Sequence, residues 1–123
     1  MTRTRIGAAT ALAFAMFVGA TALATAPQPI SGTWTYTQSN FPNPGSLELL
    51  CSDKSTYCWG LVTLGADKYN IAGVRKGTSI KFTLFLPPST EGYYTGTINA
   101  DGQSMSGNTT SNHGDTATWT ARR

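Results

Sequence analysis

Along most of this chain, hydrophobic and polar residues alternate in short runs that are separated by turn-forming residues. In residues 79–86, for example, Ile80, Phe82, Leu84 and Leu86 fall on one side of an extended chain. This period of two is typical of strands that bury one face, and no stretch shows the apolar period of a helix. The predicted strands are 31–37, 47–51, 58–64, 68–74, 79–86, 93–99, 103–110 and 116–122. The pattern therefore predicts an all-β fold.

The predicted strands are joined by short turns, so strands that are neighbours in sequence should pair antiparallel. Residues 38–45 hold two prolines and form a loop, while Asn-Ala-Asp-Gly at 99–102 favours a tight hairpin turn. An eight-stranded antiparallel up-and-down meander buries its apolar face and loses both edges when it closes into a small barrel. Glycines inside the strands favour the required coiling, namely Gly60, Gly73, Gly96 and Gly107. A two-layer β-sandwich is the alternative.

The first 26 residues have the pattern of a signal peptide. Arg3 and Arg5 precede an uncharged run rich in alanine and leucine, and small residues follow at the position of a cleavage site. We expect cleavage after Ala24 or Ala26, which leaves residues 27–123 as one β-barrel domain without a membrane anchor. The protein is then secreted or periplasmic.

The net charge gives little information about partners once the signal segment is removed. The whole chain has a formal net charge of +3, and only 12% of its residues are charged. Arg3 and Arg5 leave with the signal, so seven basic and six acidic residues remain. No long run of lysine or arginine offers a phosphate-binding patch, so we expect no nucleic-acid partner.

Cys51 and Cys58 are the only cysteines, and both belong to the exported part. An even count in an oxidising compartment predicts one disulfide, at the base of a hairpin loop. The six-residue spacing differs from the redox Cys-x-x-Cys pattern. A metal site needs three or four ligands, and His113 is far along the chain, so we expect no metal and no cofactor.

Gly32-Thr33-Trp34 stands at the start of the first predicted strand, and Arg122 ends the last one. This arrangement resembles the calycin group of up-and-down barrels, which includes lipocalins, avidins and bacterial protease-inhibitor barrels. The resemblance implies that Gly32 and Trp34 open the barrel and that Arg122 packs over Trp34 to close it. The chain is shorter than a lipocalin and lacks the several ligand-stacking tryptophans of avidins.

Five aromatic residues are predicted to point to the same side of the sheet: Trp34, Tyr36, Phe82, Tyr94 and Trp119. They either fill the barrel as core or line a cavity for an apolar or aromatic small molecule or lipid. A protein-interaction module, such as a periplasmic protease inhibitor or envelope-stress protein, is the other hypothesis. It rests on the proline-rich segments 27–29 and 41–45, which could insert into an envelope protein.

No set of residues predicts catalysis. His113, Ser111 and Asp115 lie in one predicted turn, where they cannot readily form a nucleophile, base and orienting group. Five of the six acidic residues fall in loops or turns, and Glu48 lies on the face opposite Leu47 and Leu49. A buried acid–base pair is therefore not expected, and we predict that the protein is not an enzyme.

Overall fold

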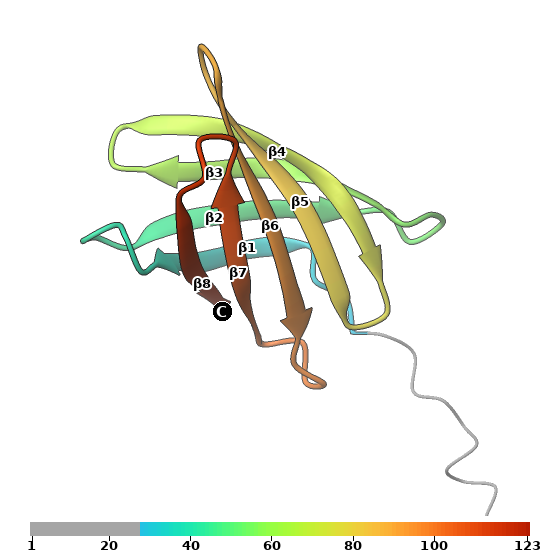
Figure 1. Cartoon of the computed structure of the whole chain (residues 1–123). Coiled ribbons are helices and arrows are strands. Elements are labelled where there is room, and N and C mark those ends of the chain that lie inside the picture. Colours follow the sequence, from blue (N-terminus) through green and yellow to red (C-terminus); the bar gives the residue numbers. More distant parts are fainter. Residues whose placement is uncertain (1–27) are drawn as a thin grey trace, which may run out of the picture.

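The computed structural model describes residues 28–123, so the predicted signal segment lies outside the described residues. Eight strands follow one another along the chain (Figure 1). They are β1 (Gly32–Gln38), β2 (Gly45–Cys51), β3 (Tyr57–Leu64), β4 (Asp67–Lys76), β5 (Ser79–Leu86), β6 (Thr90–Ile98), β7 (Ser104–Ser111) and β8 (Thr116–Arg122). The described residues contain no helix long and apolar enough to cross a membrane.

The strands form a closed barrel in which every consecutive pair is antiparallel. Closure is made by β1 and β8, where Thr35 pairs with Arg122 and Gln38 pairs with Trp119. The predicted eight-stranded meander and its closure are thus confirmed, and the sandwich alternative is not what forms. The predicted ranges of β5 and β8 match the structure, but β6 begins at Thr90 because residues 90–92 pair with the end of β5.

Alternation along the strands places one row of side chains inside the barrel. In β5, Ile80, Phe82 and Leu84 are buried, and in β8 Trp119 and Ala121 are buried. Trp34, Leu47, Met105 and Ala121 are each exposed by 1% or less. The interior is therefore a packed core, which is how side chains fill a barrel of eight strands.

Glycines let paired strands approach closely. A Cβ on Gly107 would lie 1.8 Å from the carbonyl oxygen of Thr95, and one on Gly60 would lie 1.9 Å from that of Glu48. Neither position has room for a side chain. The two glycines thus have the role that the sequence predicted, at points where the sheet coils tightly.

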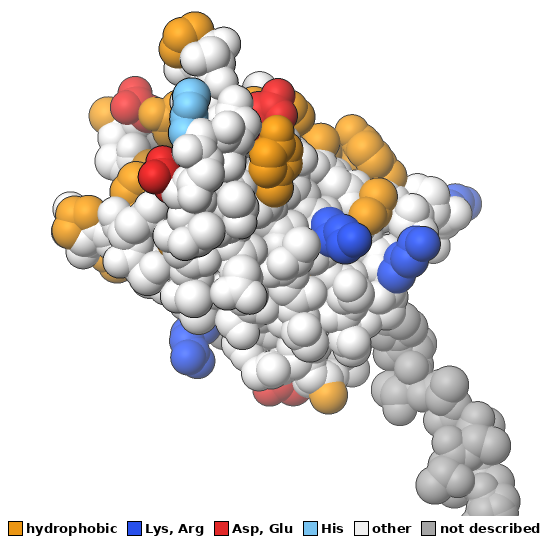
Figure 2. Space-filling model, viewed as in Figure 1, with side chains coloured by type: hydrophobic (Ala, Val, Ile, Leu, Met, Phe, Trp, Pro, Cys, Tyr) orange, Lys and Arg blue, Asp and Glu red, His pale blue; other side chains and the backbone are white. Residues whose placement is uncertain are grey.

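The barrel has two different ends. We call the end formed by residues 28–31, 52–56, 77–78, 99–103 and Arg123 the capped end, and that formed by loops 39–44, 65–66, 87–89 and 112–115 the open end. The meander places six basic side chains at the capped end: Lys54, Arg75, Lys76, Lys81, Arg122 and Arg123. In Figure 2 the blue side chains accordingly lie to the right and below, whereas histidine and several acidic side chains lie at the upper left.

Candidate functional site

Four of the five predicted aromatic residues form one cluster inside the barrel. The rings of Phe82 and Tyr94 are stacked, with centroids 4.7 Å apart, and Trp119 meets the Phe82 ring edge-on at 5.4 Å. Tyr36 stacks on Trp119 at 6.4 Å. The rings contact one another and are buried, so they make up core rather than the wall of an empty cavity.

A polar cluster lies beside these rings. The hydroxyl of Tyr94 donates a hydrogen bond to Oε1 of Gln38 at 2.6 Å and lies 3.1 Å from the hydroxyl of Tyr36. The Tyr36 hydroxyl also donates to Gln38 Oε1. The Gln38 amide nitrogen in turn donates to Oδ1 of Asn40 at 2.7 Å, in the loop that follows β1. The cluster therefore joins the barrel interior to the open end.

Burial raises the pKa of both phenols above the ordinary tyrosine value. For Tyr36 the cause is first burial and then the neighbouring Tyr94 hydroxyl. For Tyr94 burial again raises the pKa, while its hydrogen bonds with Tyr36, Thr109 and Gln38 oppose the shift. Both groups stay protonated at neutral pH, so the cluster is a set of uncharged hydrogen-bond donors and acceptors.

Sequence reasoning missed Gln38, which it placed in the loop 38–45. In the structure Gln38 is the last residue of β1 and is only 9% exposed. The signal was present, because Trp34, Tyr36 and Gln38 follow the same alternation. A polar residue at the end of a row of inward-facing residues is easily predicted as the start of a loop, because its hydrogen-bond partners on other strands are not known from the sequence.

The capped end is closed by a different arginine from the one predicted. The guanidinium carbon of Arg123 lies 4.3 Å from the centroid of the Trp34 ring, whereas Arg122 ends β8 with an exposed side chain. The predicted role of Arg122 is therefore wrong by one residue. Strand alternation governs Arg122, while Arg123 lies beyond the strand and turns inward to the ring.

Arg123 also holds together three segments at this end. Its guanidinium donates to the carbonyl oxygens of Ser31 at 3.0 Å, Pro29 at 2.5 Å and Gly102 at 2.9 Å. Gly32 has a φ of 137°, and a Cβ there would lie 3.4 Å from Arg123 Nη1. The backbone turn at Gly32 thus leaves the arginine room beside the start of β1.

Trp34 lies apart from the aromatic cluster. Its indole nitrogen donates to the carbonyl oxygen of Ile30 at 3.0 Å, and Ile30 is itself only 1% exposed. Together Ile30, Trp34 and Arg123 close the barrel interior at the capped end. Trp34 therefore lies buried at the capped end, and Gly32 and Trp34 both belong to the first residues of β1.

The open end contains an apolar pocket of about 370 Å³. Its lining residues come from the β1–β2 loop, the β3–β4 hairpin and the end of β5: Phe41, Pro42, Asn43, Leu64, Gly65, Tyr69 and Leu86. Phe41 is 39% exposed, and Leu64, Tyr69 and Leu86 are partly buried against the core. None of these residues belonged to the predicted aromatic set. They come from segments that are far apart in sequence, so their proximity could not be predicted from the pattern along the chain.

The predicted disulfide joins Cys51 and Cys58. The two cysteines are a cross-strand pair of β2 and β3, so the bridge closes the hairpin loop of residues 52–56. It is compatible with an oxidising location. Among residues 28–123, no group of three or more histidine, cysteine or acidic side chains is arranged to hold a metal ion.

The residues weighed for catalysis lie in the β7–β8 turn. The hydroxyl of Ser111 accepts hydrogen bonds from the backbone nitrogens of His113 and Asp115, at 3.1 and 3.2 Å. Nε2 of His113 lies 3.2 Å from Oγ1 of Thr90. These bonds organise an exposed turn, as local serine and histidine contacts commonly do.

The fold resembles that of a redesigned β-barrel, mFAP1, whose structure is bound to DFHBI. The two chains are 18% identical and align with a TM-score of 0.58, over 76% of this chain and 94% of that one. At this identity the similarity shows a shared small β-barrel fold alone. No family model matches the chain, and no curated protein matches it.

Proposed function

We propose that this protein binds a small apolar or aromatic molecule in the pocket at the open end of the barrel. The observation that carries the proposal is an apolar pocket of about 370 Å³ on a barrel whose other end is plugged. This volume lies in the range of small-molecule sites, roughly 300–1,000 Å³. The mFAP1 barrel, which shares the fold, is bound to DFHBI.

The pocket combines one residue of a loop with residues of the strands. Phe41 sits on a loop that is anchored by a hydrogen bond from its backbone nitrogen to the carbonyl oxygen of Gln38 at 3.0 Å. Leu64, Tyr69 and Leu86 project from regular strands and pack on the core. A ligand would remove the exposed part of the Phe41 ring from water, which is the main source of its affinity.

The polar cluster supports selectivity for a ligand with one polar group. Gln38 and Asn40 connect the buried phenols to the same end of the barrel as the pocket. A few hydrogen-bonding groups beside apolar walls orient a ligand without providing most of its binding energy. We infer an uncharged ligand, because the cluster holds no ionised side chain.

The test uses N-phenyl-1-naphthylamine, an uncharged aromatic compound that fluoresces in apolar surroundings. We expect the protein to bind it and Phe41→Ser to weaken binding by about tenfold, because loss of a half-buried phenyl ring removes on the order of 1.4 kcal/mol. Phe85→Ser is the matched control. Phe85 is 40% exposed, against 39% for Phe41, but it is not one of the residues that line the pocket.

The control separates a defined site from general surface stickiness. Equal weakening by Phe41→Ser and Phe85→Ser would contradict the proposal. So would amide NMR shifts, on addition of the compound, that avoid Leu64, Gly65 and Leu86. A second variant, Leu86→Asn, places an amide in the same pocket and should weaken binding without touching the Phe41 loop.

We also propose that the protein is exported and belongs with the calycin-like barrels. The disulfide supports export, since such bonds persist in oxidising compartments. Gly32, Trp34 and Arg123 together support the calycin resemblance. We propose a non-catalytic role, because the hydroxyl of Ser111 serves the backbone of its own turn.

Protein binding is the second candidate, and the loop 39–44 favours it. Phe41 and Pro42 are exposed at the rim of the open end, where a partner could reach them. The other proline-rich segment, around Pro29, is held to the barrel by Arg123. Pull-down of an envelope protein that is lost in Phe41→Ser, without binding of the aromatic compound, would favour this second candidate.

A further inference from the structure

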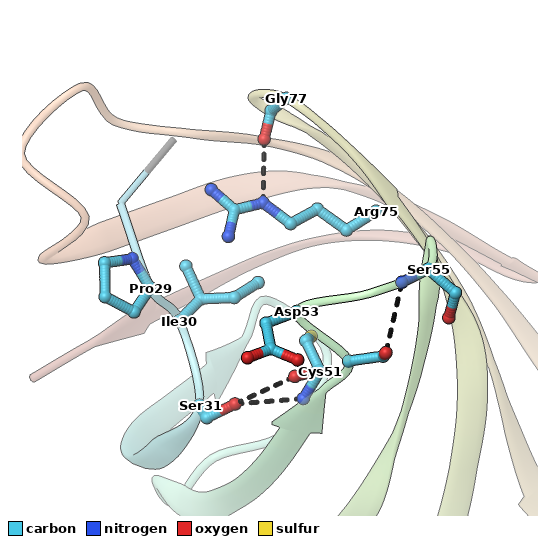
Figure 3. Close-up of a pocket in the computed structure, with 9 residues that line it drawn as sticks. Pro29, Ile30, Ser31, Cys51, Asp53, Ser55, Arg75 and Gly77 are labelled. Atoms are coloured by element: carbon cyan, nitrogen blue, oxygen red, sulfur yellow. Dashed lines mark hydrogen bonds between the residues drawn. The ribbon is translucent and has the colours of Figure 1, made fainter. Parts of the chain in front are cut away.

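A second and larger hollow, of about 740 Å³, lies at the capped end. It is bounded by the segment before β1, the disulfide loop 52–56 and the β4–β5 turn (Figure 3). The exposed Pro29 forms an apolar wall above the buried Ile30, while Ser31, Asp53 and Arg75 bring polar groups. This hollow is separated from the open-end pocket by the whole length of the barrel.

Arg75 is the unusual group in this hollow. It continues the inward row of β4 that includes Ile71 and Gly73, so its side chain starts toward the barrel axis and is half-buried. Figure 3 shows the side chain extending across the hollow toward Pro29 and Ile30. Few arginines occupy inward positions unless a partner meets their charge.

Two hydrogen bonds fix the arginine in place. Its backbone nitrogen donates to the carbonyl oxygen of Thr56 at 2.7 Å, and its Nε donates to that of Gly77 at 2.8 Å. Within the described part of the chain, its two terminal nitrogens donate no hydrogen bond. The guanidinium is therefore held at one edge, with its outer donors directed into the hollow.

The wall opposite Arg75 is also rigid. The hydroxyl of Ser31 lies 3.0 Å from the Cys51 backbone nitrogen, and the Ser52 hydroxyl accepts bonds from the backbone nitrogens of Lys54 and Ser55, both at 3.1 Å. The disulfide fixes the base of this loop. Binding would thus order little of the protein, which favours affinity.

Charge in and around the hollow favours a single negative group. The capped end carries most of the basic side chains, and burial lowers the pKa of Arg75 while leaving it protonated at neutral pH. Asp53 reaches into the hollow from the opposite side, and among residues 28–123 it forms no ion pair with Arg75. Its negative charge opposes any anion, and it opposes a doubly charged one such as hydrogen phosphate more strongly than a monocarboxylate.

We propose that this hollow binds a small monocarboxylate whose carboxylate is held by the terminal nitrogens of Arg75 and whose apolar body contacts Pro29. The planar guanidinium fork matches the two oxygens of a carboxylate. The site is independent of the open-end pocket, so the two proposals stand or fall separately.

The test compares benzoate with benzamide, which has the same shape and no charge. We expect benzoate to shift the backbone amide NMR signals of Ser31, Ser52 and Gly77. Benzamide should bind with an affinity at least about tenfold lower, measured from the same signals. Inorganic phosphate should bind more weakly than benzoate because of Asp53. Equal binding of benzamide, or tighter binding of phosphate, would overturn the assignment.

Variants identify the residue responsible. Arg75→Gln should weaken benzoate binding by about tenfold or more, and Arg75→Lys should restore only part of it because lysine lacks the planar fork. Arg122→Gln makes the same charge change on an exposed side chain at the same end and should leave binding unchanged. Equal loss in Arg75→Gln and Arg122→Gln would show a general charge effect and overturn the proposal.

Discussion

At the scale of single residues, the buried hydroxyls of Tyr36 and Tyr94 are satisfied by Gln38 and by each other. Buried polar groups stabilise a fold when their hydrogen bonds are complete and cost free energy when a partner is lost. The stability of the fold also depends on the phenols staying protonated, because burial among these rings disfavours the charged phenolate.

The first prediction concerns pH. Because the folded state raises the pKa of Tyr36 above the unfolded value of about 10, the free energy of unfolding is fully retained below that pH and falls as the pH rises above it. The fall is about 1.4 kcal/mol per pH unit for each such group. Tyr36→Phe should flatten it in denaturant titrations. An unchanged slope would contradict the assignment.

The second prediction separates the two terminal arginines. Arg123→Gln removes a cation–π contact with Trp34 and hydrogen bonds to three carbonyls, so it should lower the free energy of unfolding by about 2 kcal/mol. Arg122→Gln should change it by less than about 0.5 kcal/mol, because among residues 28–123 its exposed side chain makes no hydrogen bond and covers no aromatic ring. Denaturant unfolding of both variants checks this, and equal losses would contradict it.

At the scale of elements, the strands meet at places where only a hydrogen fits. Gly96 and Gly107 pair across β6 and β7, next to Trp119 on β8. A Cβ on Gly96 would lie 2.6 Å from the Trp119 ring. The glycines therefore make the space that the indole occupies, and the tight coiling of this sheet and the aromatic cluster depend on the same residues.

The third prediction concerns Gly107, whose added Cβ would meet the backbone of Thr95 and Gly96. Gly107→Ala should lower the free energy of unfolding by about 3 kcal/mol, because the added methyl group meets backbone atoms that cannot move without breaking the ladder. Gly65→Asn is the control, since no atom lies within 4 Å of a Cβ there and asparagine tolerates its φ of 64°. Thermal unfolding of both variants tests this, and similar losses would argue against backbone crowding.

At the scale of the whole molecule, the barrel is a ring of strands closed by its two terminal strands. β1 and β8 are joined by four residue pairs, whereas β3 and β4 are joined by eight and also by a hairpin turn. The seam between the terminal strands therefore has the fewest ladder bonds to hold it against local opening.

The fourth prediction is that amide hydrogens paired across β1 and β8 exchange faster than those paired across β3 and β4. Local opening of the seam breaks few hydrogen bonds, whereas opening the β3–β4 pair disrupts a longer ladder beside the disulfide. Native-state hydrogen exchange followed by NMR measures this directly. Slower exchange at the seam than at β3–β4 would contradict it.

The strands, their inward faces and the cysteine pair could be predicted from the residues alone, because alternation and turn chemistry are local properties. Tertiary structure decided that Gln38 completes the buried cluster, that Arg123 rather than Arg122 covers Trp34, and that Arg75 faces a hollow. Those outcomes depend on atoms contributed by distant segments, such as the carbonyls of Pro29 and Gly102 that meet Arg123. A pattern of period two specifies which side of the sheet a residue faces, but not which groups from distant segments it contacts there.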